Sequence, residues 1–265
     1  MSTFDYRPWR NGRFVWILFF LTLIVWSGFS VDTSNLMNKD GLSALKSIGI
    51  ALVSPDLSAS NLNTVVGAAW TTITYAVASL SLAILFGLPL GIIASGTLVP
   101  NRKIGLPLSV LTRAFLGMTR SIHELVWALL LVIALGLSPA AGVIAIAVPY
   151  SGIIGRIFAE RLQDVPEQQV VSLQSSGAHG FKLMALGRIP SVLPDTISYL
   201  FYRFECAIRT ASVLSFVGLG GIGFQVHIAL SDLRFETVAT LLYALIILIL
   251  SIDVISGSVR KRLLK

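Results

Sequence analysis

The chain has 265 residues, of which 55% are hydrophobic and only 12% are charged. Its mean hydropathy is +0.82, and soluble domains carry roughly 25% charged residues, so a soluble protein is excluded and an integral membrane protein is indicated. The net charge is +7, but the basic residues are scattered at the ends of apolar runs, so the charge does not indicate a nucleic-acid partner. The single cysteine, Cys206, excludes a disulfide framework.

Six apolar runs are candidates for transmembrane helices, because a crossing needs about 17 to 25 apolar residues. They lie near 14–30, 69–96, 121–138, 140–157, 195–217 and 237–256. The first run follows three arginines, as in a signal peptide, but no clean cleavage site comes after it. We therefore expect an uncleaved first helix. Residues 1–63 would comprise an N-terminal tail, this helix and an external loop.

The distribution of basic residues predicts the orientation. When the segments between spans are assigned to alternating sides, 15 of the 20 Lys and Arg residues fall on one side and three on the other. The remaining two, Arg203 and Arg209, lie inside the fifth span. The side with more Lys and Arg is normally the cytoplasm. We therefore expect both termini and the segment 155–194 to be cytoplasmic.

The second and third spans each contain an unusual feature. Gly87 and Gly91 flank Pro89 in the second span, a spacing that favours close helix packing, with a gating hinge at the proline as the alternative. Glu124 stands near the start of the third span, beside His123. It fits either a favourable position at a positive helix N-terminus or a role in a transport pathway or helix pairing. The three histidines show no metal-binding spacing, so no metal site is expected.

A polar island at 171–194 separates the fourth and fifth spans. Helix formers surround Gly177, which is expected to end a short helix. Pro190 and Pro194 are expected to stop a further helix before the fifth span begins. The pattern predicts a short docking helix on a cytoplasmic loop.

The fifth span carries three charged residues, Arg203, Glu205 and Arg209. A charged side chain near the bilayer centre costs at least about 2.5–3.5 kcal/mol, so such residues usually face protein, water or a partner. Glu205 and Arg209 are four residues apart and fit an internal ion pair. The surplus positive charge beside Thr210 and Ser212 also fits an anion pathway or pairing between subunits.

Four glycines after the fifth span match the G-x-G-x-x-G pattern of dinucleotide-binding folds. The match is spurious, because that pattern needs a preceding strand in a soluble βαβ unit. We expect these residues to form a flexible glycine hinge that breaks the helix: Gly218, Gly220, Gly221 and Gly223.

The island resembles the cytoplasmic coupling loop of permease subunits in ATP-binding-cassette importers. The family pattern is E-A-A-x-x-x-G-x9-I-x-L-P, and Gly177 and Pro190 match it at the right separation, with Ile189 at the leucine position. The resemblance implies a coupling loop at about 160–194 that docks on the ATPase. The docking residues that it implies are Ser172, Leu173, Gln174, Ser175, Gly177, Ala178, His179, Phe181 and Pro190.

Two positions depart from this pattern. Val171 replaces the glutamate and Gly187 replaces the isoleucine, while Ser172 and Leu173 stand at the two alanines. The lost glutamate removes the charge contact to the ATPase that the family pattern implies.

Within that superfamily, four stretches are similar to permeases of phosphonate importers: 120–128, 136–143, 152–160 and 202–223. The resemblance runs from about 64 to 262. It implies an all-α, type I ABC importer permease fold of about six transmembrane helices, with the transporter domain at 64–265. Its substrates would be phosphonates or related phosphorus oxyanions such as phosphite.

The resemblance also implies the partners. Two copies of the chain would form the pore as a homodimer in the lipid of a bacterial inner membrane. A dimer of ATPase subunits would bind ATP and Mg, and an extracytoplasmic phosphonate- or phosphite-binding protein would deliver the substrate. The chain has no G-x-x-x-x-G-K-[ST] motif, so we expect it to bind no ATP and to catalyse no reaction.

An ion-coupled secondary anion transporter is the alternative function, but such transporters usually show internal repeats, which this sequence lacks. A membrane enzyme would need a cluster of catalytic residues, and the scattered His, Asp and Glu residues provide none.

Overall fold

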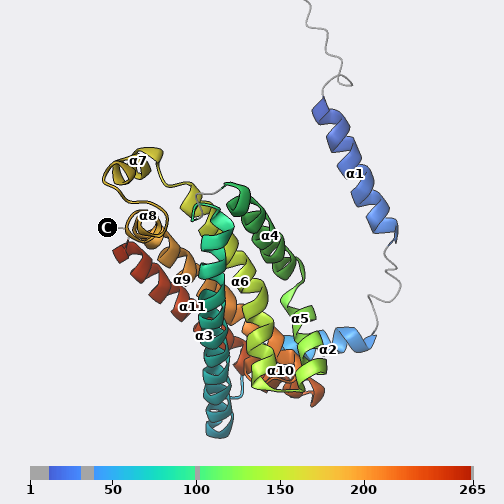
Figure 1. Cartoon of the computed structure of the whole chain (residues 1–265). Coiled ribbons are helices and arrows are strands. Elements are labelled where there is room, and N and C mark those ends of the chain that lie inside the picture. Colours follow the sequence, from blue (N-terminus) through green and yellow to red (C-terminus); the bar gives the residue numbers. More distant parts are fainter. Residues whose placement is uncertain (1–11, 31–38, 99–101, 264–265) are drawn as a thin grey trace, which may run out of the picture. The chain divides into compact units, whose positions relative to one another are not determined.

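A computed structural model describes residues 12–30, 39–98 and 102–263, and it divides into two compact units (Figure 1). The first unit is Met1–Ile50 and the second is Ala51–Lys265. The described part of the first unit contains α1 (Gly12–Ser30), an apolar helix, and most of α2 (Lys39–Val53). The segment 160–194 and the charged residues of the fifth predicted span both lie in the second unit.

All regular secondary structure in the described residues of the second unit is helical (Figure 1). In chain order these are α3 (Ala59–Ser95), α4 (Arg102–Ser121), α5 (Glu124–Leu135), α6 (Pro139–Gln163), α7 (Glu167–Ser175), α8 (Phe181–Leu183), the π-helical segment η2 (Met184–Arg188), α9 (Ile189–Leu214), the 3₁₀ turn η3 (Ser215–Val217), α10 (Ile222–Ser231) and α11 (Phe235–Leu263).

Four helical stretches among the described residues are long and apolar enough to cross a membrane. They are Ala59–Ser95, Pro139–Gln163, Phe181–Ser231 and Phe235–Arg262. They correspond to the second, fourth, fifth and sixth predicted spans. The apolar part of α1, Phe14–Gly28, is shorter.

The third predicted span, 121–138, is not one straight helix. α5 has only 12 residues, about 18 Å of helix, whereas the hydrocarbon core is about 30 Å thick. The stretches Lys103–Ser121 and Glu124–Leu135 are long and apolar enough to cross a membrane only when they are taken together, and the chain bends by 88° between them. His123 causes the break, because it is extended (φ −64°, ψ 145°) and caps α5 by accepting a hydrogen bond from the Leu125 amide.

The prediction that Pro190 and Pro194 separate a docking helix from the fifth span is wrong. α9 starts at Ile189 and continues through both prolines. Pro190 lies in the first turn of α9, where a missing amide hydrogen is tolerated. The five residues of η2 form a wider π-helical turn, which redirects the chain without ending the helix.

α3 and α6 pack closely against each other. A β-carbon on Gly87 would lie 2.9 Å from the Ser151 carbonyl oxygen, and one on Gly91 would lie 2.7 Å from that of Gly155. Both glycines therefore bring the two backbones into direct contact, as in close packing of membrane helices. The prediction of close packing at this glycine pair is confirmed.

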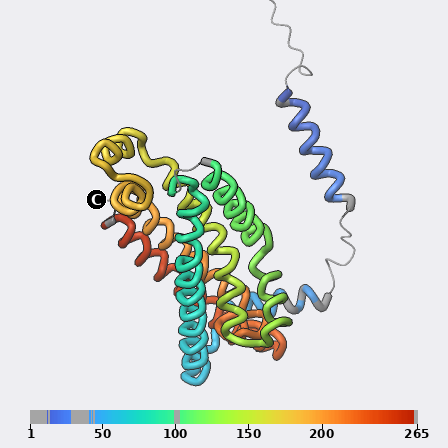
Figure 2. Tube along the Cα trace, viewed as in Figure 1, coloured from blue at the N-terminus to red at the C-terminus, as the bar shows by residue number. Residues whose placement is uncertain are grey.

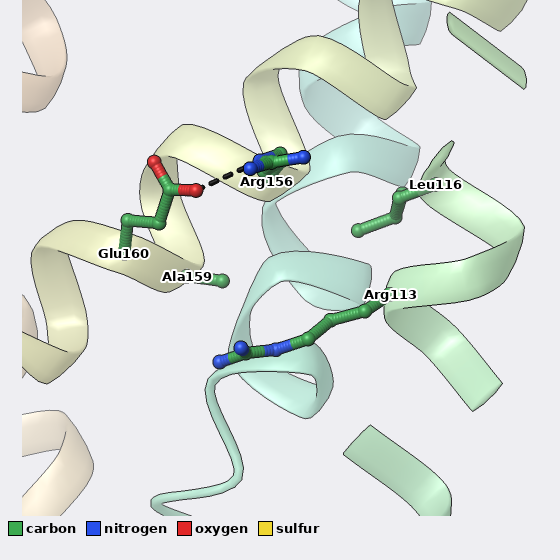
Figure 3. Close-up of a pocket in the computed structure, with 5 residues that line it drawn as sticks. All are labelled: Arg113, Leu116, Arg156, Ala159 and Glu160. Carbon is green, nitrogen blue, oxygen red and sulfur yellow. Dashed lines mark hydrogen bonds and ion pairs between the residues drawn. The ribbon is translucent and has the colours of Figure 1, made fainter. Parts of the chain in front are cut away.

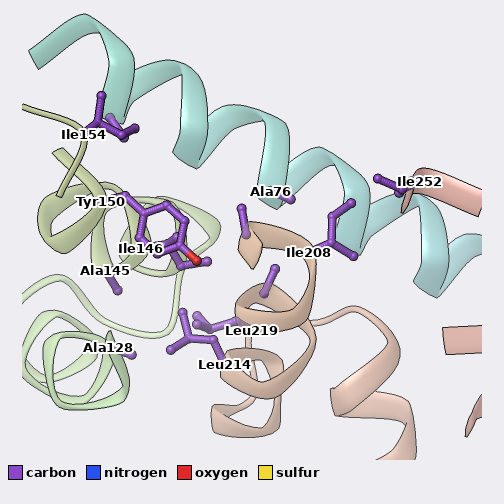
Figure 4. Packing of buried hydrophobic residues seen from close by; sticks show 13 residues of the cluster. Ala76, Ala128, Ala145, Ile146, Tyr150, Ile154, Ile208, Leu214, Leu219 and Ile252 are labelled. Carbon is purple, nitrogen blue, oxygen red and sulfur yellow. The ribbon is translucent and has the colours of Figure 1, made fainter. Parts of the chain in front are cut away.

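The main core lies where α3, α5, α6, α9 and α11 meet, together with Leu219 of the turn after α9 (Figure 4). Six of its thirteen buried residues are alanines, which allow the helix backbones to approach, and Tyr150, Ile146, Ile154 and Ile208 are also fully buried in it. Tyr150 of α6 is the largest of these and points toward α9. The core therefore holds α9, which carries the charged residues, against α3 and α6.

The two ends of the second unit differ in the elements that they contain. In Figures 1 and 2, α7, α8 and the C-terminal end of α11 lie at one end, together with the end of α3 and the start of α4. α10 and the start of α3 lie at the opposite end. Within the second unit, the segment 155–194 and the basic last turn of α11, which the distribution of Lys and Arg assigns to one side, therefore lie at the same end.

Candidate functional site

The predicted docking helix is α7, on the connection between α6 and α9. Gly177 has φ of +86°, a left-handed conformation that favours glycine. The Ala178 amide donates a hydrogen bond to the Leu173 carbonyl (3.0 Å), and the Gly177 amide donates to the Gln174 carbonyl (2.9 Å). This pair of bonds is the Schellman arrangement at a helix C-terminus. The prediction that Gly177 ends a short helix is confirmed.

The inner face of α7 is fastened to the start of the next helical run. Val170 is buried, and the Leu173 side chain lies over Gly187 of η2, with Cδ1 2.5 Å from the place a Gly187 β-carbon would occupy. The Ser191 hydroxyl donates to the Gln169 side-chain oxygen (3.3 Å). Because of these contacts, displacement of α7 would be passed to η2 and α9. Val170 belongs to a cluster with Phe158, Leu162, Val165, Leu183, Met184 and Val192.

The outer face of α7 and the turn after it are exposed. Phe181 is 75% exposed and Val171 is 51% exposed, so large apolar side chains stand on a polar surface, as at a protein interface. Leu173 and Ala178 are partly buried. The remaining predicted docking residues are exposed: Ser172, Gln174, Ser175, Gly177, His179, Phe181 and Pro190.

The carboxylate that the docking face lacks at Val171 is present one turn earlier. Glu167 lies in the first turn of α7 and is exposed. Residues four apart share a helix face, so Glu167 and Val171 face the same way. Sequence reasoning missed Glu167 because it precedes the motif. The only sign of it in the sequence is that it precedes Val171, the glutamate position of the motif, by one helical turn.

Glu205 of the fifth span is 5% exposed, and its partner lies on another helix. Nη2 of Arg260, in α11, donates to Glu205 Oε1 at 2.9 Å, whereas Arg209 Nη2 is 4.0 Å from Glu205 Oε2. The predicted pair with Arg209 is therefore the weaker of the two. Arg260 lies in the last turn of α11, so Glu205 is level with the basic end of that helix. Sequence reasoning missed Arg260 because it is 55 residues away.

Arg203 is surrounded by tyrosines. Its Nε donates to the Tyr199 hydroxyl at 2.7 Å. Its guanidinium carbon lies 5.4 Å, 5.3 Å and 5.9 Å from the ring centroids of Tyr150, Tyr199 and Tyr202. Cation–π contacts of this kind stabilise a guanidinium away from water. Arg203 thus adds positive charge to this region while it packs against aromatic rings.

A cavity of about 290 Å³ lies between the start of α5 and the last third of α9. Two distant parts of the sequence, 123–125 and 209–214, meet here, and Arg209, which is 52% exposed in the single chain, contributes the cationic wall. The side chain of Glu124 is 20% exposed. The full lining is His123, Glu124, Leu125, Arg209, Thr210, Val213 and Leu214.

The polar groups of this cavity are oriented by hydrogen bonds. His123 Nδ1 accepts a hydrogen bond from the Leu125 amide (3.2 Å), so in the neutral ring Nε2 carries the hydrogen. That nitrogen is 3.5 Å from Glu124 Oε2. On the other wall, the Thr210 and Tyr150 hydroxyls are 3.0 Å apart and share a hydrogen bond.

The structure brings together only part of the predicted pathway set. Glu124, Arg209 and Thr210 line one cavity, and Arg203 lies beside it through Tyr150. Glu205 is paired with Arg260 instead. Ser212 is buried, and its hydroxyl donates to the carbonyl of Ile208 one turn earlier on α9 (2.8 Å).

The glycine run after α9 forms a turn that is fastened to α3. Gly218, Gly220 and Gly221 have φ values of +98°, +84° and +92°, and the turn ends the helical run of α9 as predicted. The Tyr75 hydroxyl donates to the Leu219 carbonyl (2.6 Å), and the Ile222 amide donates to the Thr72 hydroxyl (3.0 Å). Gly223 belongs to α10 and packs against Ser212 of α9. In this conformation the predicted hinge is a turn that hydrogen bonds from Tyr75 and to Thr72 hold against α3.

A second polar cavity, of about 170 Å³, lies between α4 and α6 (Figure 3). Arg113 and Arg156 approach it from opposite sides, with Leu116 and Ala159 between them. Arg156 Nε donates to Glu160 (2.7 Å), and Arg113 Nε donates to the Ala94 carbonyl at the end of α3 (2.8 Å). Arg113 thus ties α4 to α3 at the end that carries α7.

The chain is similar to a known family of transport proteins. Residues 87–265 match the family described as binding-protein-dependent transport system inner membrane component. The putative phosphite transport system permease protein HtxC of Stutzerimonas stutzeri is 32% identical over 220 residues, which cover 83% of this chain and 76% of that protein. The phosphite transport system permease protein PtxC of the same organism is 28% identical over 259 residues, covering 96% of this chain and 90% of that protein.

The fold is shared with a solved transporter. A structure described as an inward-facing conformation of the MetNI methionine ABC transporter aligns with 78% of this chain and 99% of its own chain, at a TM-score of 0.68 and 18% sequence identity. At this identity the match shows the fold alone.

Proposed function

The chain belongs to the family of binding-protein-dependent transport system inner membrane components, and we propose that it forms the translocation pathway of an ATP-driven importer for phosphonates or related phosphorus oxyanions such as phosphite. The matched residues, 87–265, include the whole of α7 and both walls of the cavity between α5 and α9. The relatives named for phosphite transport support the substrate class.

One observation carries the proposal. A continuous helical run from Phe181 through Leu214 begins beside the docking helix and ends beside the cavity. At its start, η2 is held by Leu173 of α7; near its end, Arg209 and Thr210 line the cavity. A push on α7 from a partner would therefore move the residues that contact the transported anion, as a two-state transporter requires.

This arrangement supports a proposal for the partners. A dimer of ATPase subunits, which would hold ATP and Mg, docks on the exposed face of α7. An extracytoplasmic binding protein delivers the anion at the opposite end, near α10. The end that carries α7 is then cytoplasmic, as are both termini, in agreement with the positive-inside distribution. A second copy of the chain completes the pore, and Arg203 and Arg209 lie near the axis between the copies.

Uptake of methylphosphonate and phosphite tests the function. Cells that express the chain with its ATPase and binding protein should lose uptake when ATP is depleted and keep it when the ion gradients are collapsed. Arg209→Gln should abolish uptake while the complex still assembles. Uptake that depends on the ion gradient and survives ATP depletion would instead support an ion-coupled secondary transporter.

The composition of the pore needs a separate measurement. Native mass spectrometry of the purified complex should show two copies of this chain with two ATPase subunits. A complex with one copy and one related permease chain would replace the homodimer with a heterodimer, and leave the transport function intact.

A further inference from the structure

The cavity between α5 and α9 combines a hydrogen-bond donor wall with a hydrogen-bond acceptor wall. We propose that it is a substrate subsite that selects tetrahedral oxyanions with one acidic proton, such as hydrogen phosphonate or hydrogen phosphite monoanions, and rejects oxyanions without one. This inference rests on the proposed function and deepens it, because it assigns part of the selectivity to the permease itself.

Arg209 supplies the donor wall. A guanidinium donates hydrogen bonds and accepts none, and it binds ionised phosphoryl oxygens through two parallel bonds. Arg209 is available for this role because Arg260 takes the near oxygen of Glu205 at 2.9 Å, while Arg209 stays 4.0 Å from the other oxygen. The Thr210 hydroxyl, shared with Tyr150, adds a polar group beside it.

Glu124 supplies the acceptor wall. An ionised carboxylate accepts hydrogen bonds and repels oxygens that carry no hydrogen, so it binds an oxyanion only through a P–OH group. His123 lies beside the carboxylate, with its Nε2 3.5 Å from Glu124 Oε2, while its Nδ1 accepts a hydrogen bond from the Leu125 amide. A ligand hydroxyl would complete the remaining acceptor capacity of the carboxylate.

The local charge also favours a monoanion. Once Glu205 is paired with Arg260, the charged groups around the cavity are Arg209 and Arg203 against Glu124. Two arginines and one glutamate leave a formal charge of one, which a monoanion neutralises and a dianion would reverse.

The size and the apolar wall fit a small organic substituent. The volume of about 290 Å³ is several times the roughly 30 Å³ that one water occupies in the liquid. Leu125, Val213 and Leu214 form the apolar lining. A methyl or similar group on phosphorus would lie against these side chains while the oxygens meet Arg209 and Glu124.

Methylphosphonate and methanesulfonate form a matched pair of probes. Both are tetrahedral and carry a methyl group, and in slightly acidic buffer both are monoanions, but only methylphosphonate has an acidic hydroxyl. Binding is measured on the complex of permease and ATPase in lipid nanodiscs, without the binding protein, by saturation-transfer NMR of the methyl signals. We expect methylphosphonate to bind about tenfold or more tightly than methanesulfonate, because the sulfonate leaves the carboxylate unpaired.

Three variants test the roles of the two walls, and a fourth, outside the cavity, is the control. Glu124→Gln, whose amide can donate, should bring the ratio of the two affinities to about one or below. Glu124→Asp keeps the carboxylate and should keep the preference for methylphosphonate. Arg209→Gln should weaken both probes by about tenfold or more. Glu160→Gln removes a carboxylate that lies outside this cavity, where it is paired with Arg156, and should leave the ratio unchanged.

An unchanged ratio in Glu124→Gln, or the same affinity of both probes for the wild type, would overturn the proposal. ATP-driven uptake of methylphosphonate with the binding protein separates the two levels of inference. If uptake occurs but Glu124 has no effect on the ratio, only the subsite fails. If the ratio responds to Glu124 while uptake is independent of ATP, the importer function fails and the subsite stands.

Discussion

The side chain of Leu173 fills the space above Gly187, where a β-carbon would lie 2.5 Å from the Leu173 Cδ1 atom. In the coupling-loop pattern that this segment resembles, an alanine stands at the position of Leu173 and an isoleucine at the position of Gly187. The chain has exchanged the large and the small residue across one contact between α7 and η2. The contact is therefore kept although both positions depart from the pattern.

Gly187→Ala should loosen the attachment of α7, because the new methyl group cannot fit beneath Leu173 and overpacking typically costs about 1–3 kcal/mol. Leu173→Ala should also weaken it by removing the packed side chain. The double variant Leu173→Ala with Gly187→Ile should restore ATPase co-purification toward wild type. Equal recovery of the ATPase with all four proteins would show that this contact does not position α7.

Gly177 variants separate backbone strain from steric contact. A β-carbon at Gly177 meets nothing within 4 Å, but its φ is +86°, and a left-handed backbone costs an ordinary residue about 1–2 kcal/mol. Recovery of the ATPase should fall in the order Gly, Asn, Ala, because asparagine tolerates this conformation better than alanine. If the alanine variant recovers as much ATPase as the wild type, the turn at Gly177 is not needed for docking.

Glu167 is expected to make the charge contact that Val171 does not make. Glu167→Gln should reduce ATP-driven uptake and ATPase binding, whereas Glu236→Gln, an exposed carboxylate in the first turn of α11, should not. Adding Val171→Glu to Glu167→Gln should restore both, since the two positions share one face of α7. If Glu167→Gln matches wild type at low ionic strength, where exposed charge contacts are strongest, the contact is absent.

The buried pair of Glu205 and Arg260 is expected to stabilise the joint between α9 and α11. Arg260→Gln should destabilise the protein by about 3–5 kcal/mol, because it leaves a buried carboxylate without its main partner. Adding Glu205→Gln should recover most of this loss. Thermal unfolding in detergent, followed by a thiol-reactive dye on the single cysteine, Cys206, measures both variants.

Arg234→Gln is the matched control for this pair. Arg234 and its partner Asp232 are 56% and 53% exposed, and exposed pairs contribute about 0–1 kcal/mol. A similar loss of stability in Arg234→Gln and Arg260→Gln would argue against a special role for the buried pair.

The sequence predicted local features well and distant partners poorly. The helix end at Gly177 and the close approach at Gly87 and Gly91 depend on single residues and their spacing, so both could be predicted. The pairing of Glu205 with Arg260 depends on how α9 and α11 align, and no local pattern contains that information. The four-residue spacing of Glu205 and Arg209 therefore suggested the wrong main partner.

The helix α4 was missed for a related reason. Its segment contains Gly105 and Pro107 and lies between the second and third predicted spans, so the alternation of sides indicates only a connection on the cytoplasmic side. In the structure α4 packs against α6, with the Leu116 carbonyl 2.7 Å from where a Gly152 β-carbon would lie. Tertiary packing thus stabilises a helix whose local propensity is weak. The cavity was only partly predictable, because Glu124 and Arg209 meet through this packing.

The glycine contacts between α3 and α6 also determine which parts of the transporter can move. Each carbonyl of Ser151 and Gly155 sits opposite a residue without a side chain. If α3 slid along α6 by one residue, Leu88 and its neighbours would meet these carbonyls, so the two helices are locked in register. We therefore expect α3 and α6 to move together in a switch between inward-facing and outward-facing states, with the displacement taken up by other elements, such as α9 and the bend between α4 and α5.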